Sequence, residues 1–315
     1  MAVIIYGTGK ALPAAKMTNT DFPVHLDTSD EWICSHTGVS SRFIAGEGES
    51  GALLAADACR NALQGFDSSV KAQDIDLIIC ATATPDYGGF PSNACIIQRE
   101  LGAKNAACFD ICAACSGFLF AMDTAVSLME HKKSRFALVC GSEVLSRILD
   151  WEDRSTCVLF GDGAGAVLLK NTFERESAGI GSAVLGSDGR GAQQLYVDRE
   201  NHIRMNGRAV YTFAVKTLAD TVKKLLEQEH LTMDDVDLVV CHQANRRILE
   251  AAAKRLHCDF SKFVCNMEQY GNTSAASIPI TLDDLVKSGR LRKGMTIITV
   301  GFGAGLTWGG AVIRF

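Results

Sequence analysis

Two segments of this chain, about 160 residues apart, carry nearly the same sequence, and this internal repeat constrains the fold more than any other feature. Segment 74–84 reads DIDLIICATAT, and segment 235–245 reads DVDLVVCHQAN. An amphipathic helical pattern precedes each segment and another follows it. Further matches occur in the same order through both halves, and a period of about 160 residues is far longer than that of solenoid repeats. The chain is therefore expected to be a duplicated domain.

Each half is expected to fold as strand, helix, strand, helix, strand, helix, strand, strand. The strands are short, continuous and rich in β-branched residues, which is typical of sheets that helices cover on both faces. The clearest buried strands are predicted at 77–80, 136–140, 238–241 and 297–300. Amphipathic helices are predicted at 53–63, 94–101, 215–226 and 248–256. The polar interval 171–177 separates the halves, which we predict to span residues 1–172 and 173–315.

The composition excludes several classes of protein. The chain carries a formal net charge of −5 with no long run of one sign, so no nucleic-acid-binding surface is expected. No segment approaches the roughly 18 apolar residues that cross a membrane, and the N-terminus lacks a signal-peptide pattern. The twelve cysteines are too sparse for a disulfide scaffold, and several lie in apolar runs. We therefore expect a cytoplasmic protein with free thiols.

Cys115 is the first candidate for a chemical role. A short apolar strand is predicted at 106–111, small residues follow it, and a helical pattern starts at Phe118. A thiol at the start of a helix faces unpaired backbone N–H groups and the positive end of the helix dipole, and both favour the thiolate. This junction is therefore a candidate site for a cysteine nucleophile.

His242 and Asn272 become candidates for the same site because of the repeat. Segment 114–117 (ACSG) aligns with 271–274 (GNTS), so we assign Asn272 to the position equivalent to Cys115. His242 directly follows a predicted buried strand. Ligands of open α/β sheets bind beyond the carboxyl ends of parallel strands, and pseudo-twofold packing of the halves would bring these ends together. A thiol, an imidazole and an amide would then share one site.

Five motifs spread along the chain are distinctive. They are ACSGF at 114–118, FGDGAG at 160–165, HQAN at 242–245, YGNTSAA at 270–276 and GFGAGLTWG at 301–309. In order and spacing the chain resembles the β-ketoacyl-acyl-carrier-protein synthase III family of the thiolase-like condensing-enzyme superfamily. The resemblance implies a duplicated thiolase-like α/β fold, in which two similar halves pack as a five-layered α-β-α-β-α sandwich.

The resemblance also implies an activity. Cys115 attacks an acyl-CoA thioester and CoA leaves, while backbone N–H groups of Cys115 and of the turn at 303–305 hold the oxyanion. Malonyl-acyl-carrier protein then loses CO₂ as His242 and Asn272 donate to its thioester oxygen, and the carbanion attacks the acyl group. The product is a β-ketoacyl-acyl-carrier protein, which initiates fatty acid biosynthesis. No metal or redox cofactor is implied.

The resemblance further assigns contacts with CoA. Trp32 and Arg154 match the residues that enclose the adenine, where stacking and cation–π attraction would act. His36 stands where the family often has an arginine that contacts CoA, so CoA binding is expected to be weaker or more pH-dependent. Other matched substrate contacts are Phe90, Asn245, Phe302 and Ala304.

Contacts with protein partners are implied as well. The acyl-carrier protein is acidic, so a locally basic surface is expected to receive it. A homodimer is expected, in which Phe90 crosses the interface to close the acyl pocket. The residues assigned to the carrier protein are Gln243, Ala244, Asn245, Arg246 and Arg247.

Other interpretations of the same residues stay open. Cys108, Cys112 and Cys115 have the C-x₃-C-x₂-C spacing of some iron–sulfur sites, and Cys112 with Cys115 could form a redox pair. The cluster is disfavoured because Cys108 lies in a predicted strand, as does its counterpart Cys265. A Cys-His-Asn hydrolase would transfer the acyl group to water, and a related condensing enzyme would serve a specialised pathway.

Overall fold

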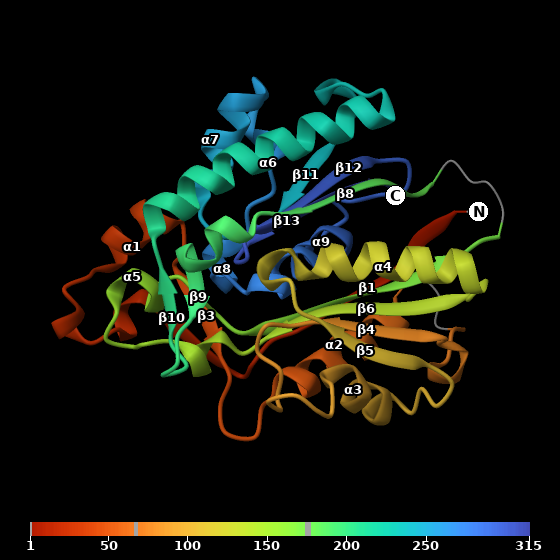
Figure 1. Ribbon diagram of the computed structural model, residues 1–315, viewed down its shortest axis with the longest axis horizontal. Coiled ribbons are helices and arrows are strands. Elements are labelled where there is room, and N and C mark those ends of the chain that lie inside the picture. Colours follow the sequence, from red (N-terminus) through yellow and green to blue (C-terminus); the bar gives the residue numbers. More distant parts are fainter. Residues whose placement is uncertain (1, 66–68, 174–177) are drawn as a thin grey trace.

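The structure, a computed structural model, describes residues 2–65, 69–173 and 178–315. Within them the chain folds into five layers, in which two β-sheets alternate with three layers of helices (Figure 1). This is the α-β-α-β-α arrangement that the repeat and the motifs predict. Residues 174–177, in the polar interval between the halves, lie outside the described residues, so the division at residue 172 stays a prediction.

The first sheet has the spatial order β1-β7-β6-β4-β5. β4 (Leu77–Ala81) is parallel to β5 (Ala107–Ile111) and to β6 (Phe136–Glu143). β7 (Gly163–Asn171) is antiparallel to β6 and to β1 (Val3–Ala11). Every residue of β4 and β6 is buried, because helices cover both faces of the sheet. β5 forms an edge of the sheet and is only partly buried.

The second sheet has the order β11-β12-β13-β8. β11 (Leu238–Cys241) is parallel to β12 (Thr296–Gly303), which is antiparallel to β13 (Thr307–Arg314). β13 is in turn antiparallel to β8 (Gly179–Ser187). Each sheet thus joins parallel strands to an antiparallel pair, as two copies of one unit require.

The second sheet lacks the strand that the repeat predicts around Cys265. Phe263 makes a single bridge to β11, and the chain then leaves the sheet. The buried amide of Gln243 explains the difference, because its Nε2 donates to Val264 O at 2.9 Å and its Oε1 accepts from Asn266 N at 3.0 Å. The Gln243 side chain therefore bonds backbone groups that a strand would use to pair with β11. The prediction that Cys265 lies in a strand is wrong.

The helices occupy the middle and outer layers. α4 and α9 lie between the two sheets, α2 and α3 cover the outer face of the first sheet, and α6 and α7 cover that of the second (Figure 1). α9 buries eight of its eleven residues, as a helix packed between sheets requires. The described α-helices are α1 (Asp30–Thr37), α2 (Gly51–Leu63), α3 (Asn93–Leu101), α4 (Gly117–Lys132), α5 (Arg154–Cys157), α6 (Gly207–Glu229), α7 (Arg246–Leu256), α8 (Met267–Tyr270) and α9 (Ser277–Lys287).

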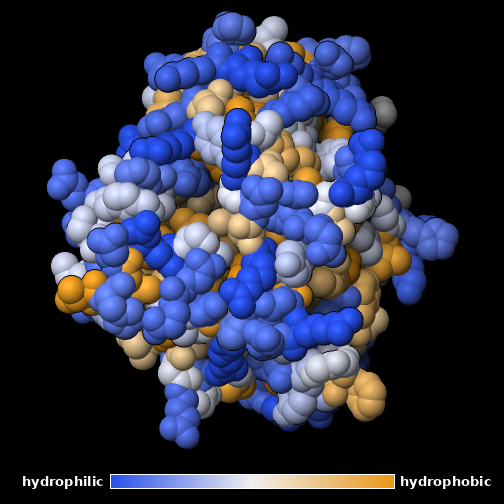
Figure 2. Space-filling view, turned by 60° about the vertical axis from the view of Figure 1, so that its left-hand side comes forward, coloured by the Kyte–Doolittle hydropathy of each residue, from blue (hydrophilic) through white to orange (hydrophobic). Residues whose placement is uncertain are grey.

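Two additions to the repeated unit lie together at one end of the molecule, on the left of Figure 1. One contains α1 and the antiparallel pair of β2 (Ala15–Thr18) and β3 (Ser41–Ile44). The other is the hairpin of β9 (Leu195–Val197) and β10 (Ile203–Met205). Figure 2 shows that this end is mostly hydrophilic, with hydrophobic residues scattered among the hydrophilic ones. Among the residues that the structure describes, no helix has the length and apolar character to cross a membrane.

Candidate active site

Cys115 lies in a short 3₁₀ turn, Ala114–Ser116, between the end of β5 and the start of α4. Ala114 has a left-handed conformation with φ of 45°, which turns the chain sharply into the helix. Cys115 is only 6% exposed, and the backbone of Gly303 in β12 packs directly against it. A Cβ at position 303 would lie 2.8 Å from Cys115 Cβ and 3.1 Å from Sγ, so this close approach requires glycine.

The turn that precedes α9 in the second half has the same backbone shape. It begins at Ser274, whose φ of 47° matches that of Ala114, and it also runs directly into a helix. Matching these two left-handed residues makes Ala275, and not Asn272, the equivalent of Cys115. The predicted equivalence is therefore wrong by three residues, because the two aligned turns share no identical residue that could fix their register.

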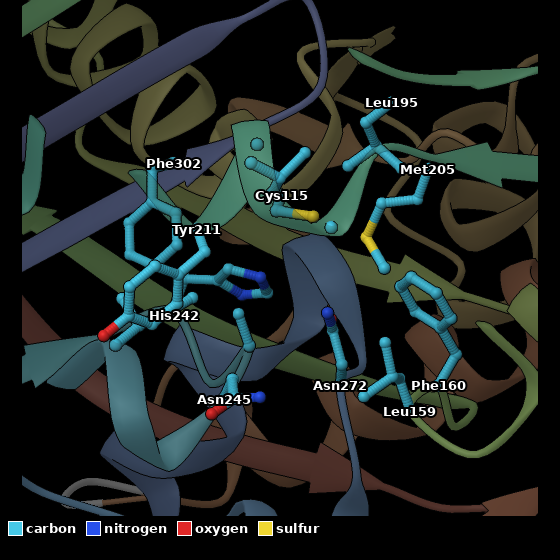
Figure 3. Close-up of a pocket in the computed structure, with 15 residues that line it drawn as sticks. Cys115, Leu159, Phe160, Leu195, Met205, Tyr211, His242, Asn245, Asn272 and Phe302 are labelled. Carbon is cyan, nitrogen blue, oxygen red and sulfur yellow. The ribbon is translucent and has the colours of Figure 1, made fainter. Parts of the chain in front are cut away.

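Asn272 nevertheless reaches the same site, because a segment of the first half holds its backbone. Asn272 N donates to Leu159 O at 2.9 Å, and Gly161 N donates to Asn272 O at 3.0 Å. The backbone N–H of Ser274 donates to Asn272 Oδ1 at 2.9 Å and orients the amide. The Nδ2 group consequently points toward Cys115, where it can donate to a ligand (Figure 3).

His242 directly follows β11, and its backbone N–H donates to Val300 O at 2.8 Å. The side chain is 1% exposed, and the ring of Phe302 packs edge-on against the imidazole, with 5.3 Å between the ring centroids. Nδ1 lies 2.8 Å from Ser277 Oγ at the start of α9, so Nε2 is the nitrogen available to a ligand. Burial lowers the pKa of His242 to about 3, so the ring is neutral near pH 7.

Cys115, His242 and Asn272 line one cavity of about 150 Å³ (Figure 3). A second cavity of about 240 Å³ adjoins Cys115, and its wall, which includes Leu145 and Ile148, is mostly apolar. Burial raises the pKa of the Cys115 thiol to about 12, although a hydrogen bond with the Ser274 side chain acts in the opposite direction. The fold therefore provides a buried thiol between two cavities, with a neutral imidazole and a side-chain amide beside one of them.

The turn after β12 is tied to the turn that carries Cys115. Thr307 Oγ1 donates to Ala304 O at 2.8 Å, and the hydroxyl oxygens of Ser116 and Thr307 are 2.7 Å apart. Ala304 lines the apolar cavity beside Cys115, and Phe302 lines the cavity of Figure 3. Both predicted residues thus lie at the site, and two backbone segments are held rigidly around the thiol.

Trp32, Arg154 and His36 form a stack. The guanidinium of Arg154 lies 5.0 Å from the centroid of the Trp32 ring, and the His36 ring stacks on Trp32 at 4.4 Å. Arg154 also donates to the backbone oxygen of Asp27 and pairs with its carboxylate. An adenine between Trp32 and Arg154 needs about 7 Å, the sum of two van der Waals contacts. The structure therefore brings the predicted residues together, but Arg154 has to move by about 2 Å to admit a base.

Gln243 is too deeply buried to contact a carrier protein, so this prediction is wrong. Its side chain is 1% exposed, and its amide is committed to Val264 O and Asn266 N. This amide holds the chain that leaves β11 against the loop after α7. The next two residues, Ala244 and Asn245, reach the wall of the cavity of Figure 3.

Asn245 has a structural task as well as a place in the cavity wall. Its Oδ1 accepts from Arg247 N at 2.8 Å and caps α7, and its Nδ2 donates to His36 O at 3.0 Å. Arg246 and Arg247 are exposed at the start of α7. Arg246 forms an ion pair with Glu250 at 2.9 Å, so the charge of Arg247 is more available to a binding partner than that of Arg246.

Phe90 lines neither of the two cavities of the described chain. Its side chain is 91% exposed, and that of Tyr87 close by in the sequence is 53% exposed. An aromatic ring this exposed is not part of the core of its own chain. Its predicted role across a dimer interface stays a prediction.

The chain is similar over its whole length to proteins of one family. A family model described as 3-Oxoacyl-[acyl-carrier-protein (ACP)] synthase III matches residues 109–189, and the model of the C-terminal part of that family matches residues 226–315. The Beta-ketoacyl-[acyl-carrier-protein] synthase III of Clostridium acetobutylicum is 48% identical, over 100% of this chain and 99% of that protein. The protein of the same name from Oceanobacillus iheyensis is 46% identical, over 100% and 99%. The chain belongs to this family.

Solved structures of synthase III proteins and their relatives have the same fold. The 3-oxoacyl-[acyl-carrier-protein] synthase III of Aquifex aeolicus VF5 superposes with a TM-score of 0.95 at 42% identity, covering 99% of this chain and 100% of that one. The priming β-ketosynthase of the R1128 polyketide pathway superposes with a TM-score of 0.91 at 34% identity, covering 99% and 96%. The chain is therefore a thiolase-like condensing enzyme of the acyltransferase class.

The geometry does not favour the alternative of an iron–sulfur cluster. Cys108 is half-buried within β5, Cys112 is exposed and Cys115 is buried. Where side chains are described, the groups close enough to share a metal ion do not include these cysteines. The group found is Asp198, Glu200 and His202, in the turn of the hairpin of β9 and β10.

Sequence reasoning missed three polar side chains that support the site. Ser277 Oγ lies 2.8 Å from Nδ1 of His242, Ser274 lines the apolar cavity beside Cys115, and Glu143 accepts from Ser274 Oγ at 3.0 Å. Glu143 had a usable signal, because it is a carboxylate at the carboxyl end of an otherwise apolar buried strand. The two serines had none, because their importance depends on the register of a turn that the repeat did not fix.

Proposed function

We propose that this enzyme condenses an acyl-CoA primer with malonyl-acyl-carrier protein to give β-ketoacyl-acyl-carrier protein, CoA and CO₂, and so initiates fatty acid biosynthesis. The observation that carries the proposal is the meeting of Cys115, His242 and Asn272, from three distant segments, in one buried cavity. The family relatives at 44–48% identity support synthase III chemistry, whereas the polyketide priming enzyme is less similar, at 34%.

The first half-reaction places the acyl group on Cys115. The thiolate attacks the acyl-CoA carbonyl, and CoA leaves as a thiolate. Negative charge on the carbonyl oxygen is stabilised by backbone N–H groups of Cys115 and of the turn that contains Ala304. The apolar cavity of about 240 Å³ beside Cys115 supports its assignment to the primer's hydrocarbon chain.

The second half-reaction uses the other two side chains. Asn272 Nδ2 and His242 Nε2 donate to the thioester oxygen of malonyl-acyl-carrier protein as CO₂ leaves and the enolate forms. This role requires the tautomer with the imidazole proton on Nε2, in which Nδ1, 2.8 Å from Ser277 Oγ, is an acceptor. The low pKa of about 3 keeps His242 uncharged, so that it stabilises charge that develops only in the transition state. The carbanion then attacks the acyl group, and Cys115 is released.

The substrates enter past surfaces at the end of the molecule shown in Figure 2. Trp32 and Arg154 enclose the CoA adenine after Arg154 swings away from Trp32. Arg247, with Arg246 beside it, receives the acidic carrier protein. The reaction needs no metal or redox cofactor, since each step uses only side chains and backbone groups of the site.

We also propose a homodimer, in which Phe90 of one subunit closes the acyl cavity of the other. Its 91% exposure supports this role, and the edge strand β5 offers unpaired backbone groups to a second copy. The twelve cysteines are free thiols, which supports a reducing cytoplasmic location. The two halves, 1–172 and 173–315, are proposed as domains that contribute the nucleophile and the His-Asn pair respectively.

Analysis of the products tests this function. Incubation with acyl-CoA and malonyl-acyl-carrier protein is expected to give β-ketoacyl-acyl-carrier protein, and Cys115→Ala is expected to abolish it. Asn272→Asp keeps the oxygen that Ser274 holds but loses the donor, so CO₂ release should fall about 10²–10³-fold while acylation of Cys115 persists. Free acid as the sole product would identify a hydrolase and contradict the proposal.

A further inference from the structure

Glu143, the last residue of β6, is a fully buried carboxyl group beside the active site. Its carboxylate accepts from Thr84 Oγ1 at 2.6 Å, from Ser274 Oγ at 3.0 Å, from Ala83 N at 3.1 Å and from Thr82 Oγ1 at 3.3 Å. All of these groups are uncharged donors. Such an arrangement stabilises a carboxylate by hydrogen bonds without neutralising its charge.

Ser274 connects this carboxylate to the nucleophile. Its hydroxyl donates to Glu143 Oε1 at 3.0 Å, and Ser274 lines the apolar cavity together with Cys115. The Ser274 side chain also lowers the pKa of the Cys115 thiol, against the larger effect of burial. Ser274 has a left-handed backbone conformation, with φ of 47°, like Ala114 beside Cys115. The Ser274 hydroxyl is thus bonded to the buried carboxylate and belongs to a residue that shares a cavity with the thiol.

The nucleophile needs a proton acceptor that the proposed mechanism does not supply. Burial raises the pKa of the Cys115 thiol to about 12. His242 has a pKa of about 3, so its neutral ring does not hold a second proton taken from the thiol. Burial also raises the pKa of Glu143, which makes its carboxylate a better proton acceptor than an exposed one. A proton that moves from the thiol to Glu143 removes an uncompensated buried charge and creates a thiolate at the N-terminal end of α4, where the helix dipole stabilises it.

We propose that Glu143 takes the proton of Cys115 through Ser274 during acylation, stores it in the acyl-enzyme, and returns it when condensation releases the thiolate. Glu143 acts through Ser274 and does not touch substrate. The inference rests on the proposed role of Cys115 as the nucleophile.

The proton balance closes over one turnover. In acylation, the S–H bond of Cys115 breaks, Ser274 Oγ takes that proton, and the hydroxyl proton of Ser274 passes to Glu143. The sulfur then bonds to the acyl carbon, and CoA leaves with the electron pair of its C–S bond and takes a proton from water. In condensation, the carbanion displaces the Cys115 thiolate, which recovers the stored proton through Ser274. Glu143 is again a carboxylate, and the only other proton donor is the water that protonates CoA.

The pH dependence of acylation tests the proposal. Single-turnover acylation of Cys115 by acyl-CoA is followed by intact-protein mass spectrometry, between pH 7 and pH 9, in the wild type, Glu143→Gln and Ser274→Ala. The wild-type rate is expected to change little over this range. Both variants are expected to be about 10²–10⁴-fold slower at pH 7 and to gain about tenfold per pH unit, because hydroxide then has to form the thiolate. CO₂ release from malonyl-acyl-carrier protein alone, without acyl-CoA, should stay within about threefold of the wild type, because Asn272 and His242 remain.

Asp162→Asn is the matched control. Asp162 is also fully buried and accepts from backbone N–H groups, of Ala45 at 2.7 Å and of Ser146 at 2.9 Å, but it is not hydrogen-bonded to Cys115 or Ser274. Any loss in this variant should be independent of pH. If Glu143→Gln acylates with the pH dependence of the wild type, the proposal is overturned. If Glu143→Gln does not fold, the pH dependence of acylation in Ser274→Ala provides the same test. Failure of wild-type Cys115 to become acylated would instead refute the proposed function.

Discussion

Gly303→Ala should impair the nucleophile without removing any reacting group. The new Cβ would lie 2.8 Å from Cys115 Cβ, 3.0 Å from Cys115 N and 3.1 Å from Sγ. Carbon–carbon contacts are normally about 3.5–4.0 Å, so the Cys115 turn has to move by about 0.7–1.2 Å. Overpacking of this kind costs about 1–3 kcal/mol of unfolding free energy. A displacement of about 1 Å at a reacting atom lowers rates by about 10²-fold, and we expect this loss in acylation.

The assay compares the rate of acyl-enzyme formation from acyl-CoA, measured by rapid quench and mass spectrometry, with the unfolding free energy from denaturant titration. Gly189→Ala is the control, because a Cβ at position 189 meets no atom within 4 Å. It is expected to leave both quantities unchanged. A Gly303→Ala enzyme that acylates at the wild-type rate would refute the argument that close backbone packing positions Cys115.

His242 should make the stability of the protein depend on pH. Its pKa of about 3 in the folded chain lies below the ordinary value of 6.5. As the pH falls from 6.5 toward 3, the imidazole therefore becomes protonated only in the unfolded chain. The unfolding free energy therefore decreases in that window, by up to about 1.4 kcal/mol per pH unit. Urea titrations of His242→Gln at several pH values should lack this contribution. An equal change of unfolding free energy with pH in the wild type and in His242→Gln would contradict the prediction. Trp32→Ala should raise KM about 2–30-fold for acyl-CoA but not for acyl-pantetheine, which lacks the adenine, and equal effects on both would exclude stacking. Arg247→Glu should raise KM for malonyl-acyl-carrier protein about five- to tenfold and weaken its salt dependence, and a changed rate of Cys115 acylation would show a different role.

The layers of the fold follow from the sequence because the repeat has a strong hydrophobic pattern. Short β-branched strands and amphipathic helices in the same order twice determine two covered sheets, and the parallel strand ends indicate where a site forms. Cys115 and His242 were recognisable because each directly follows, or nearly follows, such a strand. Asn272 was found as well, although the backbone shows that its assigned equivalence with Cys115 was wrong by three residues.

What the sequence did not predict depends on hydrogen bonds between distant segments. The strand around Cys265 is absent because the amide of Gln243 occupies the neighbouring backbone groups, and the same contacts bury Gln243 away from any carrier protein. Helical and strand periodicity contain no information on such side-chain-to-backbone contacts. Glu143 and Ser274 likewise come together only when the two halves pack against each other.

In the proposed mechanism, Cys115 carries the acyl group between the two half-reactions. Peptide mapping after incubation with acyl-CoA alone tests it most directly, because the thioester forms before malonyl-acyl-carrier protein enters. We predict one acyl group per chain, on the peptide that contains Cys115, and its loss when malonyl-acyl-carrier protein is added. Acylation of another residue, or unchanged labelling in Cys115→Ala, would contradict the account.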